Sequence, residues 1–450
     1  MSPTWRRTRT ALALALPVVL LFGNASLPPA AEAARAPFSV NTTADLPDAV
    51  PGDGFCGQSG VPNSCSLRAA VQESNALYGP DKIDLLAGTY TLTIRQADSI
   101  YASDDTAQRD DLDIRDDLTI SGAGAGSTVV DGGRFDRVFH VVGSPTVQIS
   151  GLTVQNGASY YGDGGGIYNQ AGKLTLADLV LQNDWSPDHA GGGLWTGGPT
   201  TLKRVTVIGN TGREAGGGGV YVHSTGSLNL VESTIANNHA LAGGGLYLCG
   251  PTTIVRSVIY GNSAFEGAGI SVCPGVAVSV TNATISGNSA NGQGGGLLVS
   301  GSATLTNVTV AYNSAAGGGG LSIGSAGSAR LGNTMVVYSS QSGGNCGGAR
   351  PLLIKRGHDL DDDGSCGFPN NGDNWPNTPD SKVNLGPFQN NGGLTLTHGF
   401  TAASSAIDSG DGSICPTVDQ RGFPRPVDGN GNGTALCDIG ALEQQSALPW

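Results

Sequence analysis

The sequence predicts an all-β fold, a right-handed parallel β-helix solenoid of about ten turns, with a short N-terminal helical cap and a disulfide-bearing C-terminal segment. Three observations predict this fold class. Glycine supplies 72 of the 450 residues, about twice its usual share of ~7%, and glycine triplets recur before apolar residues. Apolar and polar residues alternate in short runs, as in strands. An asparagine recurs in phase with the triplets, at a period typical of solenoids.

The apolar residue after each triplet recurs every 24 to 27 residues, and the asparagine every 24 to 28. Leucine-rich repeats have this length, but their L-x-x-L-x-L pattern is missing. No unit has room for a helix of about ten residues, so we expect three short strands per coil. The right-handed assignment follows the general rule for parallel crossovers. The apolar positions are Ile167, Leu194, Val220, Leu246, Ile270, Leu297 and Leu321, and the asparagines are Asn210, Asn238, Asn262, Asn288 and Asn313.

The first segment, residues 1–33, has the pattern of a signal peptide. A basic start precedes an apolar stretch over 11–22, which is too short to span a bilayer, and a small-residue cleavage pattern ends at Ala33. The Arg6-Arg7 pair also fits twin-arginine export, which we rank second because its flanking pattern is weak. We therefore expect a secreted protein, extracellular or on the cell surface. No later stretch of 18 residues is apolar, so no membrane span is expected.

An N-terminal cap is expected over residues 34–82. Within it, residues 66–77 place Leu67, Val71 and Leu77 on one face of a helix. Such a helix can cover the apolar end of a solenoid, which would otherwise be exposed to water.

The solenoid itself is expected over residues 83–342. Asn282, Asn307 and Asn333 recur at a bend between two strands, where asparagine tolerates the left-handed backbone that a tight corner requires. From residue 343 the triplets stop, and proline, asparagine and aspartate become frequent. We expect residues 343–450 to form a separate segment that caps the other end.

Eight cysteines behind a signal peptide predict disulfides. Eight cysteines allow 105 pairings, and proximity in the sequence favours one set. Cys249 and Cys273 occupy the same position in consecutive coils, where strands ~4.8 Å apart allow a bond. No C-x-x-C motif occurs, which argues against zinc and redox sites. The favoured pairs are Cys56 with Cys65, Cys249 with Cys273, Cys346 with Cys366, and Cys415 with Cys437.

The net charge of −13 argues against binding to nucleic acid or anionic membranes. It permits calcium and cationic partners. A simpler explanation is that like charge keeps the protein soluble.

Both ends of the mature chain resemble known families. Residues 51–56 and 65–75 (PGDGFC and CSLRAAVQESN) resemble the CSLREA domain of bacterial secreted proteins. The glycine repeats are similar to polymorphic outer-membrane-protein repeats and to other right-handed β-helices. The resemblance implies a secreted, often surface-attached, β-helical protein whose activity is largely undefined. Four C-terminal segments resemble the choice-of-anchor Q domain. They are NGGLTLTH at 391–398, AIDSG at 406–410, DQRG at 419–422 and CDIGALE at 437–443.

Two sets of residues are candidate ligand sites. The first follows the apolar anchors of four consecutive coils and should point outward as an aromatic ladder, able to stack sugar rings or to stack on itself. The second matches the first half of a calcium loop, with oxygen ligands at alternate positions and a glycine turn. A glycine-rich turn without metal is the alternative, because Ile439 stands where a complete loop has Glu. The two sets are Tyr168, Trp195, Tyr221 and Tyr247, and Asp428, Asn430 and Asn432 with Asp438 or Glu443.

No catalytic residue is assigned from the sequence, and no cofactor is expected apart from calcium. The acidic run over 104–117 fits a solvated or salt-bridged loop, and the N-T-D and G-H-G signatures of pectin hydrolases are absent. The first hypothesis is a non-catalytic protein that presents a rigid face to glycans or a cell surface. The alternative is a polysaccharide lyase or glycoside hydrolase, and a third is a structural envelope fibre. Fold alone does not decide among them, and the oligomeric state stays open.

Overall fold

The computed structural model describes residues 1–2, 35–57, 64–95, 105–213, 216–339, 343–349, 353–372, 374–401 and 404–445. Met1–Ala34 and Arg35–Trp450 are separate units, and the fold below belongs to the second. The expected signal peptide lies almost entirely outside the described residues and stays a prediction. Within those ranges, no helix combines the length and the apolar character that crossing a membrane requires.

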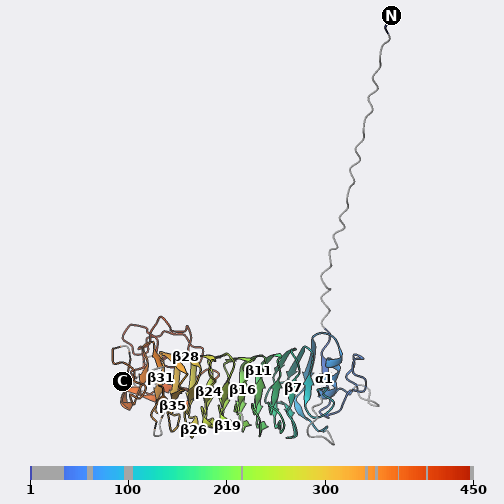
Figure 1. The fold of residues 1–450 in the computed structure, drawn as a ribbon, viewed down its shortest axis with the longest axis horizontal. Helices are drawn as coiled ribbons and strands as arrows, with labels where there is room; N and C mark the ends of the chain where they lie inside the picture. The colour runs from blue at the N-terminus through green and yellow to red at the C-terminus, as the bar shows by residue number, and fades with distance from the viewer. Residues whose placement is uncertain are drawn as a thin grey trace. The chain divides into compact units, whose positions relative to one another are not determined.

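Each full coil contributes strands to parallel sheets that run along the solenoid. In one coil, β13 (Leu194–Thr196) is followed by β14 (Pro199–Ile208) and β15 (Thr211–Gly212). Each strand pairs in parallel with its counterpart in the next coil, and Figure 1 shows these coils side by side. The predicted parallel β-helix is confirmed. One sheet holds ten strands, in agreement with about ten expected turns.

The strands form three parallel sheets. The nineteen-stranded sheet contains β1 (Phe38–Val40), β2 (Asp81–Leu85), β3 (Gly88–Thr91), β5 (Leu118–Gly122), β6 (Thr128–Asp131), β8 (Thr146–Ser150), β9 (Thr153–Gln155), β11 (Lys173–Gln182), β14, β17 (Ser227–Val231), β18 (Thr234–Ala236), β21 (Thr252–Val255), β22 (Val258–Tyr260), β25 (Ala277–Ser286), β28 (Ser302–Ala311), β30 (Ser328–Gly332), β31 (Met335–Val337), β33 (Leu353–Lys355) and β34 (Leu360–Asp361). The ten-stranded sheet contains β4 (Leu112–Ile114), β7 (Phe139–Val141), β10 (Ile167–Asn169), β13, β16 (Val220–Val222), β20 (Leu246–Leu248), β24 (Ile270–Val272), β27 (Leu297–Val299), β29 (Leu321–Ile323) and β32 (Cys346–Gly348). The five-stranded sheet contains β12 (Trp185–Ser186), β15, β19 (His239–Ala242), β23 (Ser263–Glu266) and β26 (Ser289–Ala290).

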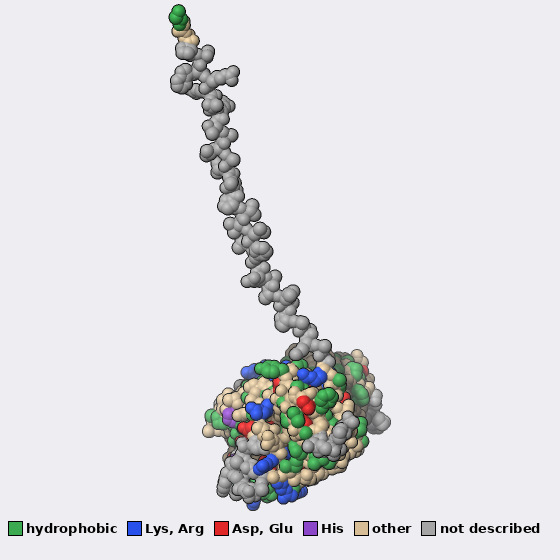
Figure 2. Space-filling view, turned by 90° about the vertical axis from the view of Figure 1, so that its right-hand side faces the viewer, with side chains coloured by type: hydrophobic (Ala, Val, Ile, Leu, Met, Phe, Trp, Pro, Cys, Tyr) green, Lys and Arg blue, Asp and Glu red, His purple; other side chains and the backbone are tan. Residues whose placement is uncertain are grey.

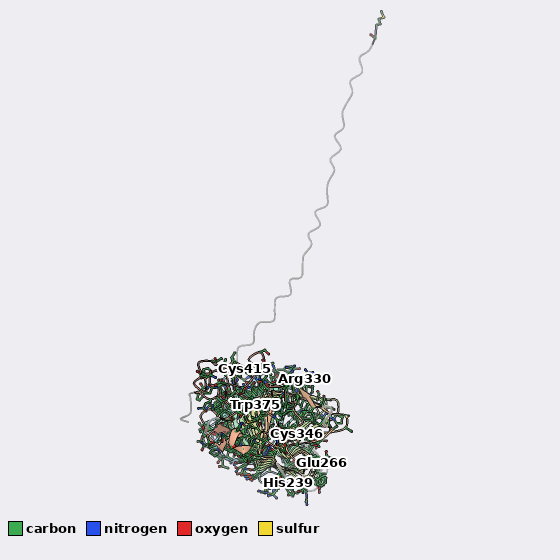
Figure 3. The ribbon with its side chains drawn as sticks, turned by 90° about the vertical axis from the view of Figure 1, so that its left-hand side faces the viewer. His239, Glu266, Arg330, Cys346, Trp375 and Cys415 are labelled. Carbon is green, nitrogen blue, oxygen red and sulfur yellow. A yellow bond between two sulfur atoms is a disulfide. The ribbon has the colours of Figure 1, made fainter. Side chains whose placement is uncertain are left out.

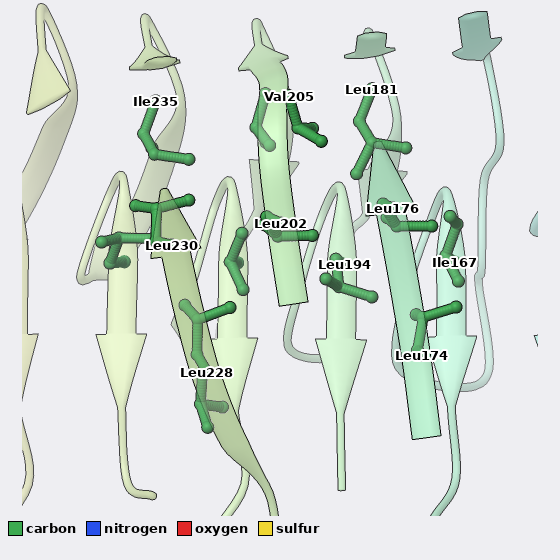
Figure 4. Packing of buried hydrophobic residues seen from close by; sticks show 14 of the residues in the cluster. Ile167, Leu174, Leu176, Leu181, Leu194, Leu202, Val205, Leu228, Leu230 and Ile235 are labelled. Atoms are coloured by element: carbon green, nitrogen blue, oxygen red, sulfur yellow. The ribbon is translucent and has the colours of Figure 1, made fainter. Parts of the chain in front are cut away.

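The core is built from inward-facing apolar residues stacked from coil to coil. Ile167 pairs in register with Leu194, Leu194 with Val220, and Val220 with Leu246, and all four are fully buried. Figure 4 shows Ile167 and Leu194 beside inward side chains of the nineteen-stranded sheet, such as Leu202. Each side chain buried in this way contributes about 1.5–3 kcal/mol. The apolar residues of the repeat therefore stack as predicted.

A left-handed corner recurs where the long strands bend. The predicted corner at Asn282, Asn307 and Asn333 is confirmed, with φ near 51° at each. Earlier coils have charged residues at the same corner, which the recurring asparagines did not predict. Neighbouring coils are linked there by ion pairs of 2.5 Å between Arg204 and Asp178 and of 2.7 Å between Arg256 and Glu232. The charged corner residues are Asp178, Arg204, Glu232 and Arg256, with φ from 48° to 55°.

The recurring asparagines form a buried ladder along the axis. In each of the first four rungs, Nδ2 donates to Oδ1 of the asparagine one coil on, at 2.9 to 3.1 Å. The same Oδ1 also accepts the backbone N–H of the preceding rung. Asp184 precedes the first rung and Ser339 follows the last. The rungs, which we name the asparagine ladder, are Asn210, Asn238, Asn262, Asn288 and Asn313.

The predicted helical cap is confirmed as α1 (Leu67–Ala76), which begins where the Ser66 hydroxyl accepts the Ala69 N–H. Arg68 in this helix is fully buried. Its guanidinium pairs with Asp45 at 2.7 Å and donates to the carbonyl of Ala107 at 3.0 Å. The cap is therefore held to the solenoid by buried polar contacts as well as by apolar ones. Figure 2 shows acidic, basic and hydrophobic side chains interspersed on this end.

All eight cysteines form the four disulfides that proximity in the sequence favoured. Cys249 and Cys273 join consecutive coils, because the residues before them, Leu248 and Val272, pair in register. Figure 3 looks at the C-terminal end of the solenoid, where Cys346 and Cys415 are labelled. Such bonds persist in oxidising surroundings and indicate an extracellular environment.

The parallel sheets continue beyond residue 342, where the solenoid was expected to end, through β32 and β33 to β34. The chain then forms α2 (Asp380–Val383) and an antiparallel pair, β35 (Leu385–Gln389) and β36 (Thr397–Phe400).

This C-terminal segment packs along the outer side of the last coils. Asn282 Nδ2 donates to the carbonyl of Val418 at 2.7 Å, and Asn307 Nδ2 donates to that of Asp438 at 3.0 Å. Phe368 also joins the main apolar core. The segment therefore covers a side of the solenoid in addition to its end.

Candidate functional site

Four aromatic side chains lie one above another on the outer face of the ten-stranded sheet. Each occupies the middle position of its strand, β10, β13, β16 or β20, and pairs in register with the next. The ring centroids are 4.8, 6.2 and 5.2 Å apart along the series. The rings contact one another, as the stacking alternative expects, and ligand binding by them remains a proposal. We name the set Tyr168, Trp195, Tyr221 and Tyr247 the aromatic row.

The glycine triplets explain how the aromatic row is held. Trp195 is only 9% exposed, and the three tyrosines are half-buried. A Cβ atom added at Gly191 would lie 2.8 Å from the Cβ of Trp195, and one added at Gly243 would lie 2.8 Å from that of Tyr247. Both glycines have positive φ. The loop backbone can therefore close against the rings and fix their positions.

The same register continues into a histidine and an aspartate. Tyr168 pairs with His140 in β7, and His140 pairs with Asp113 in β4. The His140 and Tyr168 ring centroids are 5.0 Å apart. Sequence reasoning missed this extension because the residue type changes from coil to coil. Counting back one period from Tyr168 would have found it.

Asp113 and His140 form a buried pair. The Asp113 Oδ1 and His140 Nδ1 atoms are 2.9 Å apart, and Oδ2 accepts the N–H of Ala107. Burial raises the pKa of Asp113 to about 6, although the hydrogen bond to His140 opposes the shift. A carboxylate only accepts, so Nδ1 carries the proton, and Nε2 of a neutral ring is then an acceptor. That Nε2 is buried and has no hydrogen-bond partner among the described residues.

Arg137 links Asp111, two residues before Asp113, to the aromatic row. Its Nε atom is 2.6 Å from Asp111 Oδ2, and the centre of its guanidinium lies 5.4 Å from the Tyr168 ring. Burial and the charge of Asp111 raise the pKa of Asp136 to about 7. The part of the acidic run near Asp111 and Asp113 therefore belongs to a partly buried charge cluster, whereas Asp104 lies outside the described residues.

Asp105 completes a group that can hold a cation. The ligand atoms of Asp105, Asp113 and His140 all lie within 4.8 Å of one another. Oxygen and imidazole ligands of this kind suit several divalent metals. His140 Nδ1 already bonds Asp113, so an ion at that nitrogen would replace an existing hydrogen bond.

The predicted calcium loop is folded by its own hydrogen bonds. Asp428 Oδ1 accepts the N–H groups of Gly431 and Asn432, and its Oδ2 accepts that of Gly433. Asn430 Oδ1 likewise accepts the N–H of Asn432. The glycine-rich turn therefore closes through its own backbone donors.

Asp438, the further ligand expected for that loop, is fully buried. Its two carboxylate oxygens accept N–H groups of Asp408 and Gln444. Calcium binding by these residues stays a prediction.

A groove of about 600 Å³ runs along the outer face of β11, β14, β17, β21, β25 and β28. Its lining includes hydroxyl side chains that pair from coil to coil, namely Thr253, Ser279 and Thr304. The sequence carries no distinct signal for this row, because threonine and serine at outward strand positions are ordinary.

Comparison with known proteins agrees with the architecture. The family model described as a right handed beta helix region matches residues 137–315, which contain the whole aromatic row. The chain therefore folds as a right-handed parallel β-helix. The resemblances to the CSLREA and choice-of-anchor Q domains lie outside this range and stay predictions. Among curated proteins, no match was found.

Two solved structures are similar to this β-helix at low identity. One is a pectate lyase, with 14% identity and a TM-score of 0.47, covering 85% of this chain and 91% of that chain. Another is the A-module of a mannuronan C-5 epimerase from Azotobacter vinelandii, with 13% identity and a TM-score of 0.29, covering 72% of this chain and 97% of that chain. These likenesses concern the fold.

Proposed function

We propose that this protein is a secreted or cell-surface protein that binds a polysaccharide along the aromatic row without catalysing a reaction. The observation that carries the proposal is the in-register stacking of four aromatic side chains on consecutive coils. A tyrosine or tryptophan offers an apolar ring with a polar tip, which suits sugar rings. Coils repeat every ~4.8 Å, so a glycan that lies along the solenoid would meet one aromatic side chain at each of four consecutive coils.

The charges around the aromatic row favour a neutral or amino-containing glycan. Asp111, Asp113 and Asp136 lie at one end of the row, and Arg137 is already paired with Asp111. Burial raises the pKa of Tyr168, and the negative charge of Asp163 adds to this shift. A polyanionic glycan would meet repulsion here, as it would from the net charge of −13.

Tyr247 provides the sharpest test, because it ends the row and Ser271 takes the next position. We expect Tyr247→Ala to weaken glycan binding about tenfold or more, and Tyr247→Phe to keep most of it, since one aromatic contact contributes about 0.5–1.5 kcal/mol beyond its buried area. A glycan array would find the ligand and calorimetry would measure affinity. The control is Phe265→Ala, an exposed ring in β23 of another sheet. Unchanged binding by Tyr247→Ala would contradict the proposal.

A second candidate function is a polysaccharide lyase or glycoside hydrolase, and the Asp113–His140 pair favours it. A histidine oriented by a carboxylate can act as a general base through its other nitrogen. Nε2 of His140 has no partner among the described residues and lies on the ring next to Tyr168. On this second hypothesis, His140 would be the acid–base group, at the end of the aromatic row next to Tyr168.

Turnover assays separate the two functions. A panel of neutral and acidic polysaccharides is incubated with and without calcium, and reducing ends and unsaturated products are measured. If the second function holds, Asp113→Asn should lower turnover about 100-fold or more while glycan affinity is kept. Wild-type protein that binds a glycan and releases no product from it would exclude this second candidate for that glycan.

A further inference from the structure

A second pocket, separate from the aromatic row, lies between the solenoid and the C-terminal hairpin. It has a volume of about 430 Å³, within the range of small-ligand sites. Three aromatic side chains line it: Tyr260 at the end of β22, Tyr312 just after β28, and Phe388 in β35. A Cβ atom added at Gly287 would meet nothing within 4 Å. The space above this glycine is therefore open.

The rings around this pocket form one connected group. The Phe388 ring centroid is 5.0 Å from that of Tyr260 and 5.2 Å from that of His398. The Tyr312 ring centroid is also 5.2 Å from that of His398, and Tyr338 stacks on Tyr312 with the two centroids 5.1 Å apart. Aromatic faces carry partial negative charge and attract cations within about 6 Å.

The side chains of His398 and Ser286 in this pocket have no free proton to donate to a ligand. His398 is 3% exposed, and burial lowers its pKa, so the ring is neutral. Its Nδ1 lies 2.8 Å from the Gly386 carbonyl, which can only accept, so Nδ1 carries the proton. Nε2 then accepts the hydroxyl proton of Ser286 at 2.9 Å. The Ser286 oxygen is left with lone pairs and no proton to give to a ligand.

Nearby charges add to this acceptor character. Burial raises the pKa of Tyr312, and the negative charges of Asp380 and Asp362 raise it further. The pocket-lining residues that the structure describes include no lysine or arginine. Aromatic faces, acceptor oxygens and nearby carboxylates all favour a positively charged ligand over a neutral or anionic one.

We propose that this pocket binds a small organic cation of the quaternary ammonium class, with its charge against the rings of Tyr260, Tyr312 and Phe388. This site does not depend on glycan binding by the aromatic row. It lies on strands of the nineteen-stranded sheet and on the hairpin, whereas the row lies on the ten-stranded sheet.

The test uses choline and its uncharged isostere, 3,3-dimethylbutan-1-ol, with the full chain in calorimetric titrations. We expect saturable binding of choline and at least about tenfold weaker binding of the isostere, because only the cation gains from the ring faces. Equal binding of the two probes, or no saturable binding of choline up to about 50 mM, well above 1 mM on the affinity scale, would overturn the proposal.

Matched variants locate the binding. Phe388→Leu should weaken choline binding about tenfold, Tyr312→Phe should keep it, and Phe265→Leu on β23 is the control with an exposed ring elsewhere. Tyr312→Leu is a second ring-removing variant in case Phe388→Leu disturbs the hairpin, and a thermal melt reports folding. Choline binding unchanged in both ring-removing variants would place the site elsewhere and refute the assignment. A methyl glycoside that binds this pocket more tightly than choline would also refute it.

Discussion

Asp184 takes the place of an asparagine at the start of the asparagine ladder. Its N–H donates to Asn210 Oδ1, and its own Oδ1 accepts the N–H of Gly157, as the amide oxygens do in later coils. In those coils the other arm of the side chain donates to a carbonyl, as Asn210 Nδ2 does to Leu181 at 3.1 Å. The corresponding Oδ2 of Asp184 is buried and has no hydrogen-bond partner in the part of the chain that the structure describes. Only a protonated carboxyl group can donate there.

This residue makes stability depend on pH. Burial raises the pKa of Asp184 well above 3.8 in the folded state, so the protonated group stabilises the fold fully below 3.8, and this effect is lost as pH rises through the folded-state pKa. We expect Asp184→Asn to be more stable than wild type by about 1–3 kcal/mol at pH 7.5, with the difference shrinking towards pH 4. Urea unfolding at a series of pH values measures it.

Asp188→Asn is the control for this experiment, because it makes the same change at an exposed position a few residues away. A constant difference between Asp184→Asn and wild type from pH 4 to 7.5 would show that Asp184 is not protonated in the folded state.

At the scale of elements, the asparagine ladder joins coils through side chains where the strands themselves are short. Asn262 is a central rung. Its Oδ1 accepts from the backbone N–H and Nδ2 of Asn238, and its Nδ2 donates to Asn288 Oδ1 and to the carbonyl of Ile235. Every one of these contacts is buried, so the loss of one rung leaves donors and acceptors unpaired on both sides.

We therefore expect Asn262→Ala to lower the free energy of unfolding by about 3–5 kcal/mol, since several buried polar groups lose their partners together. Chemical denaturation followed by circular dichroism gives the value. The matched control is Asn229→Ala on the exposed face of β17, expected to change stability by less than about 0.5 kcal/mol. A similar decrease in the free energy of unfolding in the two variants would contradict this. It would show that the hydrogen bonds of the ladder contribute no more than an exposed asparagine side chain does.

At the scale of the whole molecule, each coil contacts chiefly its two neighbours, so stability depends on how the ends are closed. The N-terminal end relies on the buried ion pair of Arg68 and Asp45, together with hydrogen bonds from Arg68 to the carbonyls of Ala107, Asp110 and Asp111. The other end is protected differently, because the C-terminal segment also lies along the side of several coils.

We expect Arg68→Met to destabilise the protein by about 3–5 kcal/mol, because it leaves the Asp45 carboxylate buried without its cation. Hydrogen exchange should show the largest loss of protection in β2 and β4, next to the cap. Arg109→Met, at an exposed position in the same region, serves as the control. Uniform loss of protection along all coils would instead indicate that the solenoid unfolds as one unit and that the cap has no local role.

The sequence was most informative where one period places like residues above one another. Ile167 and Leu194 stack, Asn282 and Asn307 form left-handed corners, and Cys249 bonds Cys273, all from simple counting. Counting the repeat period did not identify stacked residues where their type changes from one coil to the next. Asp113, His140 and Tyr168 share no motif, although they occupy one position of three consecutive strands.

The packing of the C-terminal segment was also beyond prediction from the sequence. Asn307 meets Asp438 across 131 residues, with no repeat to set the register between them. The pocket at Tyr260 and Phe388 depends on the same long-range contacts. Sites formed between a periodic and an aperiodic part of a chain leave no spacing signal in the sequence.

The bond between Cys249 and Cys273 has a mechanical consequence. A stacked solenoid pulled from its two ends peels open one layer at a time, because each layer is held mainly by the next. The covalent link closes a loop with a sequence separation of 24 residues. When unfolding reaches this bond, the chain between Cys249 and Cys273 therefore cannot be extended. Under tension in an oxidising medium, the middle of the protein would therefore act as a stop that keeps its contour length shorter than the full unravelled chain.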